Sequence, residues 1–156
     1  DGTAKTGLLS EMLKGDGDKN LISSPSDWFT LPGPTGETGA TIASSPGHCP
    51  DVAPATGNSQ FPCAGRNWVR GDYATSRYNH VMPPNGKSCS HNFSGTLTAT
   101  QINEQGGAHT ASSHHPGGVN LACVDGSLRF IADSVDPSVW FAAGSKNGDE
   151  TVSGSF

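Results

Sequence analysis

Histidine, cysteine and acidic side chains are the residues that could give this chain a chemistry of its own. None of its histidines forms an H-x-H or H-x-x-x-H pair of the kind that binds zinc or copper. The segment Ser88-Cys89-Ser90-His91 brings a thiol and an imidazole close together in sequence. However, no nucleophile motif such as G-x-S-x-G and no phosphate-binding loop accompanies it. We therefore expect a protein that is not an enzyme and has no transition-metal site.

His115 and Asp125 resemble an acid–base pair at first, with nine residues between them. The apolar run at 119–124 between them predicts a strand, which would span roughly 20 Å at about 3.3 Å per residue. The two side chains would then lie at opposite ends of that strand. His115, with Pro116-Gly117-Gly118, is expected to order the loop that enters it.

Residues 119–131 carry the signature of a β-hairpin. Two apolar runs flank Asp125-Gly126, a pair that favours turns in which both residues have positive φ. The following segment predicts a short helix, because Asp136 can cap it, Pro137 suits its first position and Gly144 suits its end.

Asp16-x-Asp18-x-Asn20 is similar to the start of a calcium-binding loop. The glycine expected at the sixth position is Leu21, and no glutamate stands at the twelfth. Calcium is thus the one cofactor that the sequence leaves open, and a polar turn is the alternative.

Four cysteines lie at positions 49, 63, 89 and 123, and no C-x-x-C pair is present. Zinc is therefore not expected, and an oxidising compartment would allow three disulfide pairings. Cys49, Cys63 and Cys89 are the disulfide candidates, and Cys49 with Cys63 could close a short cycle. Cys123 lies in an apolar run and is expected to be a buried thiol.

Composition points to a mostly β, α+β domain over residues 1–156, with an antiparallel sheet, long loops and one short C-terminal helix. Apolar residues make up 33% of the chain, and 21 glycines and 11 prolines favour turns. The net charge is −5, and no cluster of basic residues is evident. Nucleic acid and anionic membrane surfaces are therefore not expected as partners. The low charged fraction is typical of exported proteins.

Residues 25–65 predict a long loop excursion with one or two short strands, anchored by Trp28 and Phe29. Further strands are predicted at 78–82 and 96–102. Residues 3–14 suit a helix and a strand about equally.

Tryptophan and tyrosine side chains could stack on sugars or pack in the core, and the core is their commoner location. The aromatic residues that raise this question are Trp28, Trp68, Tyr73 and Trp140. A glycan remains a candidate ligand on this basis.

Three segments together resemble a bacterial prepilin-type family that is defined by an H-X9-DG motif. The first is the motif itself, with His115, Pro116, Gly117, Gly118, Asn120, Asp125 and Gly126. The other two are the segment Asp1–Glu11 and the segment Tyr78–Asn85 with Cys89. The segments reach both ends and the middle of the chain, so the resemblance covers nearly all of it.

The resemblance implies a pilin-like or pseudopilin-like head in an extracytoplasmic assembly. Its partners would be copies of itself or other pilin-like subunits. Such proteins usually begin with a leader and an apolar helix, neither of which occurs in this sequence. We therefore expect the head of a longer precursor, whose N-terminal portion is a further candidate partner. The alternative is an extracellular binding head that recognises glycan or protein through residues 25–65 and exposed aromatic side chains.

Overall fold

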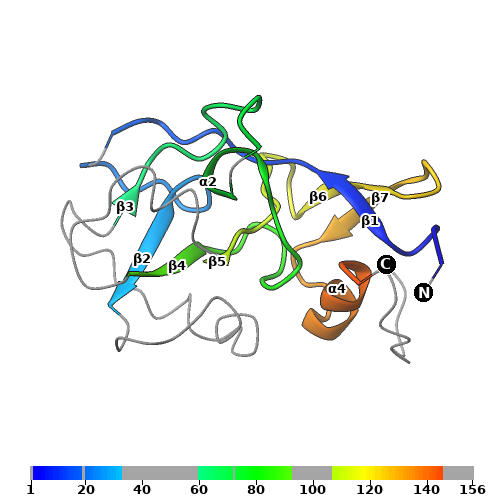
Figure 1. Cartoon of the computed structure of the whole chain (residues 1–156). Coiled ribbons are helices and arrows are strands. Elements are labelled where there is room, and N and C mark those ends of the chain that lie inside the picture. Colours follow the sequence, from blue (N-terminus) through cyan, green and yellow to red (C-terminus); the bar gives the residue numbers. More distant parts are fainter. Residues whose placement is uncertain (1, 19, 33–59, 72, 93–106, 146–156) are drawn as a thin grey trace.

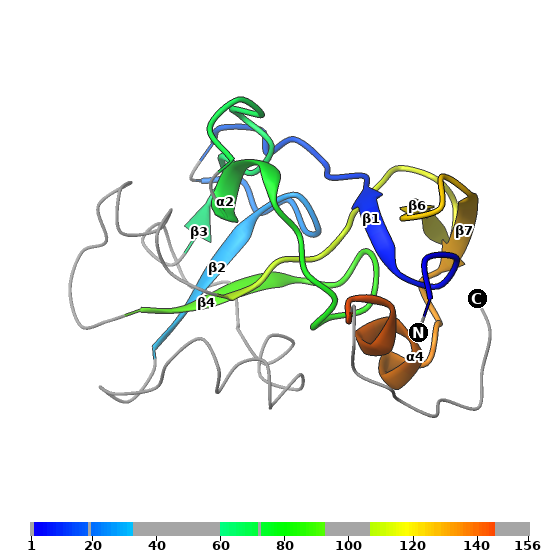
Figure 2. The same cartoon turned by 45° about the vertical axis from the view of Figure 1, so that its right-hand side comes forward.

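The structure is a computed structural model, and it describes residues 2–18, 20–32, 60–71, 73–92 and 107–145. Two sheets lie at opposite ends of this described part, joined by irregular segments (Figures 1 and 2). This agrees with the expected α+β, mostly β class.

The first sheet has three antiparallel strands in the order β1 (Gly7–Ser10), β6 (Gly118–Cys123) and β7 (Leu128–Ala132). Alternate residues of β6 point to opposite faces, so Val119, Leu121 and Cys123 are all buried on one of them. Ala111, Ile131 and Trp140 complete this core cluster. The first segment of the chain is therefore a strand, one of the two alternatives that its sequence allowed.

The predicted hairpin is confirmed in β6 and β7, but its turn differs from the expected one. Gly126 has φ +84°, whereas Asp125 does not have a positive φ. The amide of Gly126 donates to the Cys123 carbonyl at 3.0 Å, and the Cys123 amide donates to the Ser127 carbonyl at 2.9 Å. A three-residue connection with one left-handed glycine therefore replaces the two-residue turn with two positive φ angles.

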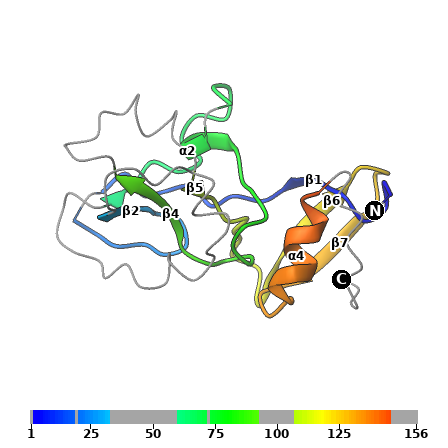
Figure 3. The same ribbon diagram turned by 60° about the horizontal axis from the view of Figure 1, so that its bottom comes forward.

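The predicted C-terminal helix is α4 (Pro137–Ala143), which packs on one face of the first sheet (Figure 3). Its Asp136 cap accepts from the Ser138 amide at 2.8 Å. Val139, Trp140 and Ala143 are its buried residues. Gly144 ends the helix with φ −83°, so close approach rather than a left-handed conformation requires glycine there. A Cβ at this position would lie 2.7 Å from Cβ of His80.

The second sheet has four strands in the order β3 (Gln60–Phe61), β2 (Trp28–Pro32), β4 (Ser88–Asn92) and β5 (Gly107–Ala108). The pairing of β2 with β4 is parallel, so this second sheet is mixed, whereas the first is the expected antiparallel sheet. Parallel strands need a long connection, and more than fifty residues separate these two in sequence. Trp28 and Phe29 are 1% and 2% exposed, which confirms them as anchors.

The strand predicted at 78–82 is absent from the described part of the chain, and these residues are irregular. Asn79 explains the difference, because its side chain takes the hydrogen bonds that a strand partner would make. Its amide nitrogen donates to the Gly107 carbonyl at 2.6 Å, and its oxygen accepts from the His109 amide at 3.2 Å. The single helical turn α2 (Tyr73–Ser76) precedes this segment.

Two predicted segments fall wholly or partly outside the described residues. The strand expected at 96–102 lies outside them, as does the middle of the 25–65 excursion. The two ends of this excursion contain β2 and β3. Among the described residues, no helix has the length and apolarity needed to cross a bilayer.

Candidate functional site

The carboxylate of Glu11 connects two of the segments that carry the sequence resemblance, the N-terminal segment Asp1–Glu11 and the H-X9-DG motif. Its Oε1 contacts Nε2 of His115 at 3.1 Å and accepts from the Asn120 side-chain amide at 3.2 Å. Its Oε2 accepts from the Asn120 backbone amide at 2.9 Å. A carboxylate only accepts hydrogen bonds, so His115 carries a proton on Nε2. His115 is therefore bonded to Glu11 and not to Asp125.

Solvation and hydrogen bonding act in opposite directions on Glu11. Burial alone would raise its pKa, but the Asn120 hydrogen bonds and the nearby His115 hold the pKa below its ordinary value of 4.5. The side chain is still 34% exposed, which weakens the charge interaction. This cluster fastens β1 to β6, which is a structural role.

Replacing Glu11 by glutamine is expected to lower the free energy of unfolding by about 1 kcal/mol at neutral pH, because the amide forms fewer and uncharged hydrogen bonds. Since the folded-state pKa is depressed, the native carboxylate stabilises the fold above its unfolded pKa. That stabilisation is lost as the pH falls through the folded pKa. Urea unfolding of both proteins at neutral and acidic pH measures the difference. An equal difference at both pH values would contradict the assignment.

Asp125 and Gly126 serve the hairpin turn. The Asp125 carboxylate accepts from the Ser127 amide at 2.9 Å and from the Ser127 hydroxyl at 2.7 Å. The Ser127 hydroxyl and amide therefore lower the pKa of Asp125 below its ordinary value. The Asp125 amide donates to the Thr3 carbonyl at 3.1 Å. His115 and Asp125 thus lie beyond opposite ends of β6, as the spacing predicted.

The two glycines of the motif are required for different reasons. Gly117 has φ +80°, a conformation that side chains with a Cβ rarely adopt, and it has open space around it. Gly118 has no space for a side chain, because a Cβ there would lie 2.2 Å from the Ile131 carbonyl oxygen and 2.8 Å from the Phe130 ring. Pro116 precedes them on the exposed loop.

Alanine at Gly118 is expected to cost about 3 kcal/mol of unfolding free energy, because β7 must move away. At Gly117 the same change is expected to cost about 1–2 kcal/mol through backbone strain. Asparagine tolerates the left-handed conformation, so Gly117→Asn should recover part of the loss whereas Gly118→Asn should not. Urea denaturation of the four variants measures this. Recovery at Gly118, or none at Gly117, would show that the two reasons are wrongly assigned.

The face of the first sheet that α4 leaves open carries large apolar side chains. We call it the outer sheet face and define it by Leu9, Asn120, Ala122, Leu128 and Phe130, which are paired across the strands as Leu9 with Ala122, Ala122 with Leu128, and Asn120 with Phe130. The side chains of Leu9, Leu128 and Phe130 are 65%, 77% and 52% exposed. Polar groups border it at both ends, around Glu11 and around the hairpin turn.

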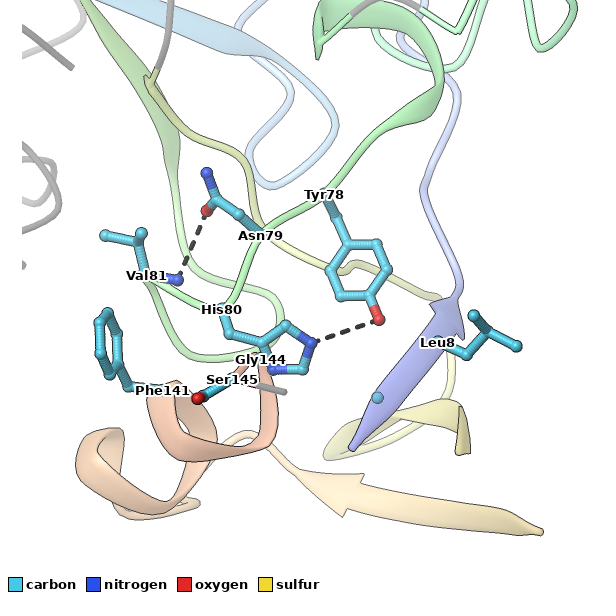
Figure 4. Close-up of a pocket in the computed structure, with 9 residues that line it drawn as sticks. Leu8, Tyr78, Asn79, His80, Val81, Phe141, Gly144 and Ser145 are labelled. Carbon is cyan, nitrogen blue, oxygen red and sulfur yellow. Dashed lines mark hydrogen bonds between the residues drawn. The ribbon is translucent and has the colours of Figure 1, made fainter. Parts of the chain in front are cut away.

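A groove lies between β1, the segment 78–81 and the C-terminal end of α4 (Figure 4). Its volume is about 400 Å³. Nδ1 of His80 lies 2.9 Å from the Trp140 carbonyl, and Nε2 lies 3.3 Å from the Tyr78 hydroxyl. Because a carbonyl only accepts, Nδ1 carries the proton and the Tyr78 hydroxyl donates to Nε2.

The two polar aromatic side chains of the groove, His80 and Tyr78, both have structural roles. Burial lowers the pKa of His80 to about 4, and burial raises the pKa of Tyr78 to about 12. The imidazole stacks on Trp140 with ring centroids 4.0 Å apart. A neutral, doubly hydrogen-bonded imidazole and a protonated phenol stabilise the packing of α4, and no carboxylate lies beside them among the groove residues.

Asn85 ties the middle segment of the resemblance to the hairpin. It has φ +56°, and its side-chain nitrogen donates to the Asp133 carboxylate at 2.7 Å. Its side-chain oxygen accepts from the Ser113 amide at 2.8 Å. Residues of all three segments that carry the sequence resemblance therefore form hydrogen bonds that hold the fold together.

The candidate calcium residues form two successive turns. Asp16 accepts from the Asp18 amide at 2.8 Å, and Asp18 accepts from the Asn20 amide at 2.8 Å. The Asp18 amide and the Ser23 hydroxyl lower the pKa of Asp16. Within the described residues, no three histidine, cysteine or acidic side chains lie close enough to hold a metal ion. Calcium binding stays an untested prediction.

The cysteines differ from the expected arrangement at one position. Cys63 is a free thiol that accepts from Nη1 of Arg66 at 3.5 Å, so the expected cycle between Cys49 and Cys63 is wrong. Cys123 is a buried free thiol, as predicted. Cys89 is buried and disulfide-bonded, which removes it as a thiolate nucleophile. Cys49 lies outside the described residues.

Trp28 and Trp140 are core residues, whereas Trp68 is 82% exposed. Exposure of this one tryptophan could not be predicted from the sequence, because it lies in a polar segment without periodicity. Glu11 was found only through the resemblance, since a single glutamate carries no local signal.

One comparison with known proteins identifies a relationship. A family model described as "Protein of unknown function (DUF1559)" matches residues 1–138. No curated protein and no solved structure matches the chain. Because the family model covers most of the chain, the protein belongs to this family of uncharacterised domains.

Proposed function

We propose that this chain is a non-enzymatic structural subunit of an extracytoplasmic, pilus-like assembly. The outer sheet face would be its contact with a neighbouring subunit, either a copy of itself or another pilin-like chain. The observation that carries the proposal is the exposure of Leu9, Leu128 and Phe130 on one open sheet face.

Exposed apolar patches with a polar border are typical of protein–protein interfaces. Here the border is formed by the Glu11–His115–Asn120 cluster at one end and by Asp125 with Ser127 at the other. The residues of the H-X9-DG motif therefore frame this face and hold its strands together. Within the described residues β7 is paired on one side only, which leaves its other edge open to a neighbour.

The residues that could do chemistry support the non-enzymatic part of the proposal. His115 binds a carboxylate that is already engaged by Asn120, and His80 is buried between Tyr78 and Trp140. Cys89 is disulfide-bonded. Each group has a structural partner that accounts for its position.

The alternative, a binding head that uses the 25–65 excursion, has less support. Trp28 and Phe29 in that excursion are buried, so they offer no stacking surface. Residues 33–59 lie outside the described part of the chain.

Analytical ultracentrifugation of the purified chain and of its variants tests the proposal. Phe130→Glu and Leu128→Glu should each raise the dissociation constant of self-association by at least about tenfold, since a charge then has to be buried. Phe141→Glu is the matched control, because Phe141 is 50% exposed on α4, away from the outer face. Equal weakening by all three variants would argue against the outer sheet face. If the isolated chain is monomeric, the same variants are compared for incorporation into the assembly of the producing cell.

A further inference from the structure

A second exposed apolar feature lies outside the outer sheet face, on the connection between β3 and α2. Residues 66–70 form a projecting loop, which we call the 66–70 tip. The Arg70 amide donates to the Asn67 carbonyl at 3.3 Å, so Trp68 and Val69 occupy the corner of a turn. They are 82% and 72% exposed. Trp68 has the largest exposed fraction of the large apolar side chains in the described part of the chain.

The base of the tip is fixed to the rest of the fold. The Gly15 amide donates to the Ala64 carbonyl at 2.8 Å, and the Gly17 amide donates to the Pro62 carbonyl at 2.9 Å. Gly65, at φ +64°, lies against Lys14, where an added Cβ would be 3.2 Å from the Lys14 Cα. The base therefore holds the apolar corner away from the core and directs it outward.

Arginines lie beside this corner in the sequence. Arg66 and Arg70 flank Trp68 and Val69 in sequence, and the Arg77 guanidinium lies 4.0 Å from the position of a Cβ on Gly71. Residues 66–77 carry three arginines and one aspartate, whereas the whole chain has a net charge of −5. The sequence showed no run of basic residues because these arginines are spaced four to seven residues apart.

We propose that the 66–70 tip binds the surface of an anionic lipid bilayer. Tryptophan is enriched where hydrocarbon meets headgroups, and a neighbouring exposed valine adds apolar surface that can enter the same layer. Arginines beside them would pair with lipid phosphates. An exposed valine contributes little to sugar stacking, so a bilayer accounts for more of the tip than a glycan does. The proposal replaces the expectation that anionic membranes are not partners.

Intrinsic fluorescence reports on this tip selectively. The chain has three tryptophans, and Trp28 and Trp140 are 1% and 0% exposed. A shift of the emission maximum to shorter wavelength on adding vesicles would therefore come mainly from Trp68. The vesicles are phosphatidylcholine alone and an equimolar mixture of phosphatidylcholine with phosphatidylglycerol. Co-sedimentation with the same vesicles gives the partition coefficient.

The expected result is a blue shift and co-sedimentation with the anionic vesicles only, both weakened by salt. Trp68→Ala should lower the partition coefficient by at least about tenfold. Arg66→Gln and Arg70→Gln should each lower it by about fivefold. The double variant Leu128→Ser, Phe130→Ser is the matched control with exposed apolar residues on the outer sheet face, and it should bind as the native chain does.

Three outcomes would overturn the proposal. The first is an absence of binding to anionic vesicles. The second is binding that survives Trp68→Ala but is lost in the outer-face control. The third is a Trp68-dependent shift with a uronic acid polysaccharide and none with vesicles, which would assign the tip to an anionic glycan. Free phosphate at the same concentration should give no shift, since the apolar corner contributes only at a bilayer.

Discussion

Replacing Trp140 by alanine is expected to lower the free energy of unfolding by about 3–5 kcal/mol, the range found when a large buried aromatic residue is removed. Trp140 is fully buried in the core cluster of the first sheet. Its ring stacks on His80 at 4.0 Å and on Tyr78 at 6.4 Å, so its loss leaves a cavity between α4, the first sheet and the irregular segment 78–82. Urea denaturation followed by circular dichroism measures the change.

Phe141→Ala is the control for that experiment. Phe141 is the next residue on the same helix and is 50% exposed, so its replacement should cost less than about 1 kcal/mol. Trp140→Phe keeps part of the volume and gives a measurable intermediate value if the alanine variant does not fold. Equal losses at positions 140 and 141 would contradict the packing of α4 described above.

Acid is expected to destabilise the fold strongly through two buried histidines. Burial lowers the pKa of His80 to about 4 and the pKa of His109 to about 3, against an ordinary value of 6.5. Below 6.5 the unfolded chain binds protons at these positions while the folded chain does not. Stability should therefore fall with the pH by up to about 2.7 kcal/mol per pH unit until the folded-state pKa values are reached.

Carboxyl groups modify this dependence at lower pH. Burial raises the pKa of Asp27, so protonation of this residue favours the folded chain and offsets part of the loss. Urea unfolding at a series of pH values measures the slope. His80→Phe and His109→Phe should each flatten it, because each removes one of the two buried imidazoles. Constant stability across the mildly acidic range would contradict the neutral, buried state of both imidazoles.

Local patterns predicted the C-terminal half of the fold well. The alternation of apolar residues around Asp125-Gly126 and the sequence Asp136-Pro137 depend on interactions within a few residues, and both elements formed where expected. The turn type was wrong because the pair Asp-Gly also suits a longer connection with one left-handed glycine.

Elements that depend on distant partners were harder to predict. The segment 78–82 has the composition of a strand, but Asn79 bonds the backbone of Gly107 and His109 and replaces the ladder. The disulfide state of Cys63 depends on which thiol lies near it in space. In the same way, only the structure shows that the Arg77 guanidinium lies near Gly71, next to the 66–70 tip.

The same distinction applies to the outer sheet face. Alternation in β6 and β7 indicates which side chains share a face. Which of the two faces α4 covers is decided by Trp140 and its partners, and only the structure shows it. The apolar character of the uncovered face is therefore a finding of the structure.

Site-specific photocrosslinking in the producing cell tests the subunit contact most directly. Phe130 is replaced by p-benzoylphenylalanine on the outer sheet face, and Phe141 is replaced in the same way as the control. If the proposed subunit contact is correct, adducts form from position 130 to a second copy of this chain or to another pilin-like subunit, identified by mass spectrometry of the crosslinked peptides. Efficient crosslinking at 141 with none at 130 would contradict it.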